Sequence, residues 1–185
     1  MKSIKGKKLI YVILIIILFS AWIVKLISRS ESDKALMEKM IAKQIKTKKP
    51  VILYNLWVLE NYRLAGYVIG DEDKYEKFSF VVFNLNQEGD YEIIDVIEPY
   101  KTINEAADIT VYEFSQIKIG DFLVDRQLAI MNNNPNLSKA ELVVENGESQ
   151  IQEVYSIPEV IIFEDLDENW DLEYKLYDKY GNTIN

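Results

Sequence analysis

Residues 51–70 read "VILYNLWVLENYRLAGYVIG" and contain two runs of apolar side chains separated by a short polar turn. The period of these runs is two, which is typical of β-strands and not of helices. Residues 51–59 are apolar on both faces, which predicts a central strand that is covered on both sides. Residues 62–70 follow after the turn and are expected to form the next strand.

The same pattern continues along the chain and predicts about nine short strands without crossover helices between them. The loop "NQEGD" joins two of these strands and places Gly89 where a positive φ is expected, and Asn146-Gly147 is a strong hairpin signal. The segment "TINEAAD", residues 102–108, has capping-box spacing and predicts a short helical turn. We therefore expect a mainly β protein whose residues 51–185 form an antiparallel β-sandwich or barrel-like domain. The alternative is an α+β fold in which a helix over residues 31–47 packs on one curved sheet.

The segment "LIYVILIIILFSAWIVKLI", residues 9–27, is almost continuously apolar. At about 1.5 Å per residue a helix of this length spans roughly 28 Å, close to the thickness of the hydrocarbon core. Trp22 and Ile23 stand where a signal peptidase needs small side chains, so the segment predicts an uncleaved single-pass anchor. A cleaved signal peptide and a buried soluble helix are the alternatives. The four lysines of residues 1–8 predict a basic cytoplasmic tail, which places the C-terminal domain outside the cytoplasm.

Residues 28–50 are expected to form an amphipathic helical stalk. Ser30 and Asp33 resemble a capping box and Pro50 supplies a stop signal. The stalk carries one apolar stripe, which packs on the domain or on a partner, or alternatively lies along the lipid surface. The stripe consists of Leu36, Met37, Met40, Ile41 and Ile45.

Charge divides the chain into two parts. Residues 1–49 hold twelve Lys and Arg against three acids, a net charge of +9, whereas residues 50–185 hold nine against twenty-seven, a net of −18; the two sum to the overall −9. The acidic part should repel nucleic acid and attract basic groups, so we expect no nucleic-acid partner and instead a protein or peptide partner, of which a basic one fits the charge. The simpler alternative is that the acids keep an exported domain soluble.

The residue types and motifs that the sequence lacks exclude most catalytic chemistry. The chain has no histidine and no cysteine, which removes Ser-His-Asp and Cys-His catalysis, ordinary zinc sites and disulfides. It also lacks the glycine-rich phosphate-binding motifs and the G-x-S-x-G motif. We therefore predict no catalytic, cofactor-binding or metal-binding residues, and a protein that is not an enzyme.

An excess of Lys over Arg and the absence of disulfides suit a Gram-positive envelope.

The string "DLDENWDLE", residues 165–173, partly matches a calcium-binding loop. Asp165, Asp167 and Asn169 occupy the first, third and fifth positions, but Trp170 stands where such a loop needs glycine. The preferred interpretation is a strand that turns four apolar side chains inward. These are Trp170, Leu172, Tyr174 and Leu176.

Aromatic residues are abundant in the acidic part of the chain. Packing inside the sheets accounts for most of them. The alternative is an exposed aromatic row that binds glycan or peptide. Its members would be Tyr62, Tyr67, Tyr75 and Tyr100.

Three stretches carry a resemblance to known proteins: "YRLAGYVIGDEDKYEKFSFVVFNLNQEGDYEII", "LAIMNNNPNLSKAELVV" and "EYKLYDKYGNTI". They resemble small single-pass membrane proteins and lipoproteins of Gram-positive bacteria, although this chain lacks the lipoprotein cysteine. The resemblance implies a β-rich extracytoplasmic domain and no particular site. The function expected is a non-enzymatic binding or accessory module, for sensing or for immunity against a cationic peptide. The alternatives are a structural or assembly subunit that acts through its anchor and stalk, and a carboxylate-dependent enzyme.

Overall fold

The computed structural model describes residues 31–106, 108–144 and 149–184. The expected tail of residues 1–8, the expected anchor of residues 9–27 and the Asn146-Gly147 turn lie outside the described residues. Within the described residues, no helix has the length and hydropathy to cross a membrane. The chain forms two compact units, Met1–Lys39 and Met40–Asn185. The strands all belong to the second unit.

The described residues contain thirteen β-strands and one helix over residues 31–44. All strand pairs are antiparallel, so the predicted mainly β, antiparallel class is confirmed. The strands are β1 (Val51–Leu59), β2 (Tyr62–Gly70), β3 (Tyr75–Leu85), β4 (Tyr91–Ile97), β5 (Lys101–Ala106), β6 (Ile109–Phe114), β7 (Ile117–Ile119), β8 (Phe122–Val124), β9 (Arg126–Asn132), β10 (Leu137–Val143), β11 (Ser149–Glu153), β12 (Glu159–Leu166) and β13 (Glu173–Asp178).

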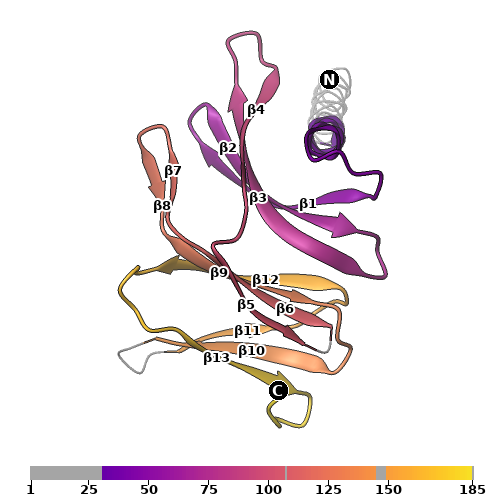
Figure 1. Ribbon diagram of the computed structural model, residues 1–185, viewed down its shortest axis with the longest axis vertical. Helices are drawn as coiled ribbons and strands as arrows, with labels where there is room; N and C mark the ends of the chain where they lie inside the picture. Colours follow the sequence, from indigo (N-terminus) through magenta and orange to yellow (C-terminus); the bar gives the residue numbers. More distant parts are fainter. Residues whose placement is uncertain (1–30, 107, 145–148, 185) are drawn as a thin grey trace, which may run out of the picture. The chain divides into compact units, whose positions relative to one another are not determined.

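These strands form three stacked sheets and a small hairpin within the second unit (Figure 1). The first sheet has the order β1-β2-β3-β4, the middle sheet β12-β9-β6-β5 and the third sheet β11-β10-β13, while β7 and β8 pair with each other. The prediction that residues 51–59 form a central strand is wrong, because β1 lies at the edge of the first sheet. A register shift between Leu53 and Leu56 interrupts its pairing, and Leu56 and Val58 are exposed at this edge.

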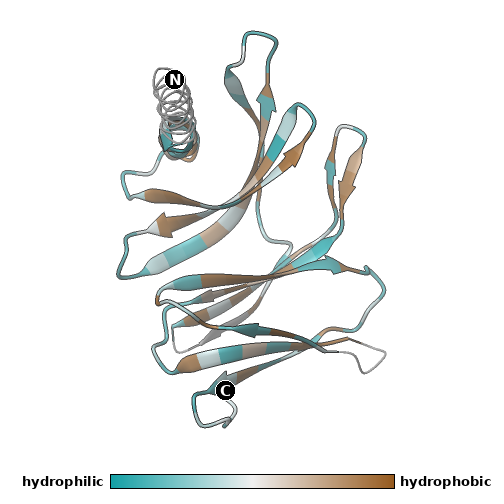
Figure 2. Ribbon diagram, turned by 180° about the vertical axis from the view of Figure 1, so that it is seen from behind, coloured by the Kyte–Doolittle hydropathy of each residue, from teal (hydrophilic) through white to brown (hydrophobic). Residues whose placement is uncertain are grey.

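The middle sheet is buried on both faces and separates two hydrophobic cores. Along β9, Ala129 and Met131 belong to the core shared with the first sheet, whereas Leu128 and Ile130 belong to the core shared with the third sheet. We call these the first core and the second core. Apolar residues accordingly appear in all three layers (Figure 2). The fold is therefore a layered sandwich with one layer more than a two-sheet sandwich contains.

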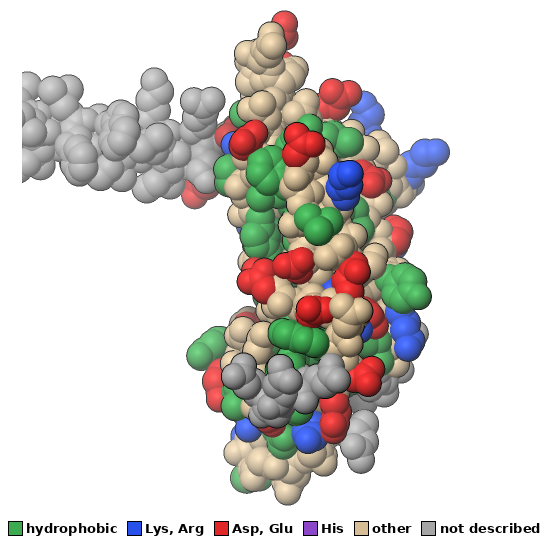
Figure 3. Space-filling model, turned by 90° about the vertical axis from the view of Figure 1, so that its left-hand side faces the viewer, with side chains coloured by type: hydrophobic (Ala, Val, Ile, Leu, Met, Phe, Trp, Pro, Cys, Tyr) green, Lys and Arg blue, Asp and Glu red, His purple; other side chains and the backbone are tan. Residues whose placement is uncertain are grey.

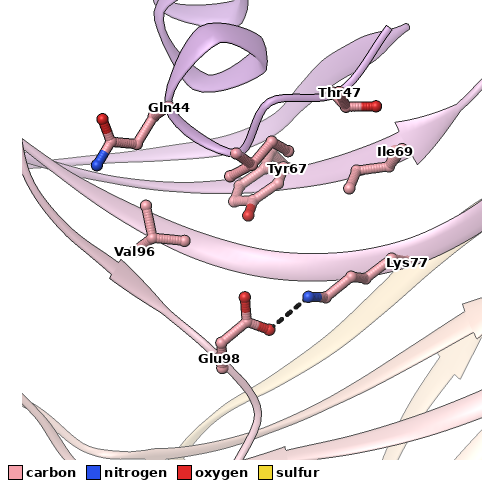
Figure 4. A pocket seen from close by; sticks show the side chains of 8 residues that line it. Gln44, Thr47, Tyr67, Ile69, Lys77, Val96 and Glu98 are labelled. Atoms are coloured by element: carbon pink, nitrogen blue, oxygen red, sulfur yellow. Dashed lines mark ion pairs between the residues drawn. The ribbon is translucent and has the colours of Figure 1, made fainter. Parts of the chain in front are cut away.

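The outer face of the first sheet is also buried. In β3, Phe78 and Phe80 point into the first core, while the alternate residues Ser79, Val81 and Phe83 are fully buried on the opposite face. The segment from Gln44 to Thr47 borders this opposite face, as Figure 4 shows. Both expected architectures are thus present in part, because a sheet sandwich also carries the end of a helix on its outer face.

The helix ends before the predicted stop at Pro50. The amide of Thr47 donates to the carbonyl of Ala42 at 3.1 Å and the amide of Lys46 donates to that of Lys43 at 3.3 Å, while Lys46 has a φ of 56°. This is a Schellman motif, which closes the helix and satisfies its last carbonyl groups without help from a proline. The predicted capping residue Ser30 lies outside the described residues.

The predicted helical turn in "TINEAAD" is also wrong. Residues 101–106 form β5, which pairs with β6 at the edge of the middle sheet. A capping-box spacing predicts only a local preference, and here the ladder with β6 provides partners for the backbone groups instead. The predicted positive φ at Gly89 is confirmed, at 88°.

Candidate functional site

Seven residues from three parts of the chain surround a pocket of about 410 Å³, which we call the acidic pocket. Gln116 lies between β6 and β7, and Asp125 lies between β8 and β9. The end of β12 and the turn that follows it supply the other five residues. These are Asp165, Asp167, Glu168, Asn169 and Trp170.

The turn after β12 has a structure that its sequence explains. Asp167 accepts hydrogen bonds through Oδ1 from the backbone amide of Asn169 at 2.8 Å and from its Nδ2 at 3.0 Å. This is an Asx-turn, the arrangement that Asp and Asn favour in loops. Asp165 sits at a register shift of β12 with a φ of 58°. The turn therefore presents several carboxylates toward solvent within a few residues.

The string of residues 165–173 matches the strand interpretation in part. Trp170 and Leu172 pack on the second core and Leu176 is buried, so the predicted inward alternation is confirmed. Strand β13, however, begins only at Glu173, and the residues before it form the turn. Across the described ranges, no three acidic side chains are placed to hold a metal ion together.

Arg126 holds this turn in place through hydrogen bonds to its backbone. Its Nη1 donates to the carbonyl oxygen of Trp170 at 2.8 Å and to that of Glu168 at 3.5 Å. Its Nη2 lies 2.7 Å from Oε1 of Glu113, and the two side chains of this ion pair expose 14% and 15% of their surface. Both terminal nitrogens of the guanidinium are therefore occupied, Nη2 by Glu113 and Nη1 by the backbone of the turn.

The acidic pocket has a strongly negative charge. Four of its seven lining residues are acids and none is basic. Among the ion pairs of the described residues, none involves Asp125, Asp165, Asp167 or Glu168. Carboxylates of one sign around a concave surface focus the field and attract cations. On the face of the molecule shown in Figure 3, acidic side chains are likewise numerous between hydrophobic ones.

A second pocket of about 420 Å³ lies under the end of the helix, and we call it the helix-end pocket (Figure 4). The end of the helix and its Schellman turn supply one wall, and β2, β3, β4 and the residue after β4 supply the other. Its lining residues are Gln44, Ile45, Thr47, Tyr67, Ile69, Lys77, Val96 and Glu98.

A chain of polar side chains runs along the floor of the helix-end pocket. The Nζ atom of Lys77 lies 2.6 Å from Oε2 of Glu98, and the hydroxyl of the fully buried Ser79 donates to the same carboxylate at 3.4 Å. Ser79 also hydrogen-bonds to the hydroxyl of Tyr67. Burial raises the pKa of Tyr67 to about 12, because the phenolate would lose its solvation, so the phenol stays neutral at physiological pH.

Among the described residues, the alternative of an exposed aromatic row is not supported. Tyr67 and Tyr75 are buried, with 1% and 9% exposure, and Tyr62 is half-buried against the first core. Tyr100 is 74% exposed and stands apart from the other three in this respect. The preferred interpretation, in which aromatic residues mainly serve packing, is confirmed for three of these four residues.

Neither pocket was predicted as a site from the sequence. The acids of residues 165–168 drew attention, but Asp125 lies 40 residues and Gln116 49 residues before Asp165, and they become its neighbours only through the fold. Comparisons of the chain with protein families, with curated proteins and with solved structures found no significant match. The class that the fold and the pockets define is therefore a layered antiparallel β-protein with one acidic pocket and one pocket at the end of a helix.

Proposed function

We propose that this chain is a non-enzymatic, membrane-anchored binding module on the outside of a bacterial envelope, and that its acidic pocket holds the cationic side chains of a basic peptide. The observation that carries the proposal is the set of four carboxylates around one cavity, without a basic residue in its lining. Trp170 adds an aromatic wall that can contact an ammonium or guanidinium group. Sensing of a cationic peptide, or immunity against it, are the roles that this chemistry serves.

The size of the acidic pocket favours a side chain over a bare ion. A volume of about 410 Å³ is ample for one or two long cationic side chains. The described carboxylates do not converge in a group of three that suits a metal ion. Separated carboxylates on a curved wall instead match the spaced charges of a peptide rich in Lys and Arg.

The proposed location depends on the segment of residues 9–27 and on the basic residues before it. Protease added to intact spheroplasts should remove the part of the chain after the anchor, because that part would face outward. An antibody against the C-terminal residues detects the loss. Survival of the intact chain until the cells are lysed would contradict an extracytoplasmic domain.

Peptide capture is tested by titrating the full chain, in a nonionic detergent, with a fluorescent Lys- and Arg-rich peptide. The variant Asp125→Asn, Asp165→Asn, Glu168→Gln removes three charges and keeps nearly the same side-chain shapes. We expect its affinity to fall by about tenfold or more, because the charge-assisted contacts are lost. Asn is also tolerated at the positive φ of position 165.

The matched control removes three exposed acids elsewhere through Glu72→Gln, Glu88→Gln and Glu92→Gln. It has the same net charge as the pocket variant, so a purely general attraction would weaken equally in both. We expect the control to lose less than about threefold, since distant surface charges are screened by salt. Equal losses in the two variants, or binding that does not depend on salt, would contradict the proposal.

A structural or assembly role is the second candidate. Leu36, on the predicted apolar stripe, is 47% exposed and is available for a contact with another helix. Crosslinked oligomers that disappear on Leu36→Glu would favour this role. A carboxylate-dependent enzyme has less support. Among the described residues, the carboxyl groups whose pKa is shifted are Glu141 and Asp178, and hydrogen bonds to Tyr177 and Asn182 lower both values. A general acid needs a raised value.

A further inference from the structure

The helix-end pocket has the properties of a small-molecule site. Its volume of about 420 Å³ lies within the range of roughly 300–1,000 Å³ that is usual for ligand pockets. Polar groups from both walls border it: Gln44 and Thr47 from the end of the helix, Lys77 and Glu98 from the sheet. Figure 4 shows the ammonium of Lys77 directed at the carboxylate of Glu98, with Tyr67 between this pair and the helix.

The charges of the pocket select the class of ligand. Lys77 and Glu98 form an ion pair with each other, and their side chains expose 42% and 55% of their surface, so a ligand can reach both. A ligand with one charge would pair with one member and leave the other to water, so the number of ion pairs would not increase. A ligand with one ammonium and one carboxylate exchanges one ion pair for two and leaves every charge paired.

The carboxylate is held in place before a ligand arrives. Ser79 donates to Glu98 at 3.4 Å from a fully buried position, and its own hydroxyl is fixed by Tyr67. Ser79 cannot touch a ligand, so it acts as a positioning residue. A carboxylate oriented in this way loses little side-chain freedom on binding.

The remaining wall is aliphatic. Ile45, Ile69 and Val96 are half-buried and border the same cavity. The ring of Tyr67 is 1% exposed and offers no free face on which a sugar or an aromatic ring could stack. The wall therefore favours a ligand with a short aliphatic side chain.

From these observations we infer that the helix-end pocket binds a small zwitterion with an aliphatic side chain, that is, a free aliphatic α-amino acid. The ammonium group contacts Glu98, the carboxylate contacts Lys77 and the side chain lies against Ile45, Ile69 and Val96. Gln44 and Thr47 contribute hydrogen bonds from the end of the helix. This site is separate from the acidic pocket and does not depend on peptide capture there.

The test is calorimetric titration of the full chain in a nonionic detergent with four probes. L-Leucine carries both charges, leucinamide carries only the ammonium, 4-methylpentanoate carries only the carboxylate, and glucose is neutral. We expect leucine to bind at least about tenfold more tightly than each of the other three. Each singly charged probe loses one charge-assisted contact, and glucose loses both.

Two variants identify the two contacts. In Lys77→Met, leucine and leucinamide should bind equally, and in Glu98→Gln, leucine and 4-methylpentanoate should bind equally. In each variant the two matched probes should still bind measurably, which a misfolded variant would not do. Lys179→Met, an exposed lysine near the C-terminus, serves as the control and should leave leucine binding unchanged. The proposal is overturned if no binding of leucine is detected at about 10 mM, a concentration roughly ten times the dissociation constant of a weak complex of about 1 mM. It is also overturned if all four probes bind alike, or if the two variants keep the wild-type selectivity.

Discussion

Replacement of Phe163 by alanine should lower the free energy of unfolding by about 3–5 kcal/mol, the usual cost of removing a buried phenylalanine ring. Phe163 is fully buried in the second core. Its strand, β12, belongs to the middle sheet, which also forms one wall of the first core. The destabilisation should therefore extend beyond the core in which the cavity is made.

Two tryptophans allow the two cores to be observed separately. Trp57 packs against the first core and Trp170 against the second. In a background with Trp22→Phe and Trp170→Phe, fluorescence of Trp57 reports the first core during a urea titration of the full chain. With a slope of about 2 kcal/mol per M, Phe163→Ala should move the midpoint of Trp57 by roughly 1.5–2.5 M toward lower urea.

Tyr155→Ala provides a matched control. Tyr155 is also a large aromatic residue, but it is 85% exposed, so its removal should change stability by less than about 0.5 kcal/mol. If the midpoint of Trp57 stayed in place in Phe163→Ala, the two cores would unfold independently. The middle sheet would then not couple them, and the layered arrangement would consist of two separate folding units.

The class of the fold could be predicted from the sequence because the period of two is a local signal. It is visible in residues 51–59 and 62–70, and both segments are strands. The number of layers is not a local property. Strand β6 carries Val111 toward one core and Tyr112 toward the other, and a strand that is apolar on both faces does not show which sheets will cover it.

The same limit explains the strands that were not predicted. The five residues of β11, "SQIQE", are all exposed, so burial leaves no alternating apolar pattern in them. This strand exists because its backbone pairs with β10. The position of β1 at a sheet edge could likewise not be predicted, because its apolar sequence indicates that both faces are covered and says nothing about its hydrogen-bonded neighbours.

The two pockets could not be predicted because their residues meet only in the folded chain. Lys77 and Glu98 are twenty-one positions apart, and Gln44 comes from a different element again. Among the residues of the acidic pocket, the acids at 165–168 were noticed, but the role of Arg126 was not. An isolated arginine in a strand gives no sign that it holds a turn forty-four residues later.

Substitution of Arg126 by methionine should destabilise the protein by about 2–3 kcal/mol. The substitution leaves the carboxylate of Glu113 without its cation in a position that is 15% exposed. Breaking a fully buried pair costs about 3–5 kcal/mol, and the partial exposure here reduces that cost. Urea titration measures the effect.

The double variant Arg126→Met, Glu113→Gln separates the ion pair from the general loss of packing. Its destabilisation should be smaller than the sum of the two single variants by about 1–2 kcal/mol, because the unpaired carboxylate is no longer present. Additive effects would mean that the 2.7 Å contact between the two side chains contributes nothing to stability.

Arg126 should also determine the shape of the acidic pocket, since its Nη1 atom donates to the carbonyl oxygens of Glu168 and Trp170. Without these bonds the turn is released, and acrylamide, a neutral quencher, should reach Trp170 more readily in Arg126→Met under conditions in which the protein remains folded. Glu113→Gln keeps the bonds to the turn and should leave the quenching of Trp170 unchanged, although it removes the ion pair. An equal increase in the quenching of Trp170 in both variants would show that the ion pair, and not the bonds to the backbone, holds the turn. Unchanged quenching in both would show that neither contact holds it. We therefore expect a single arginine to have two separable effects, because its Nη2 atom pairs with Glu113 while its Nη1 atom holds the turn that carries the carboxylates of the acidic pocket.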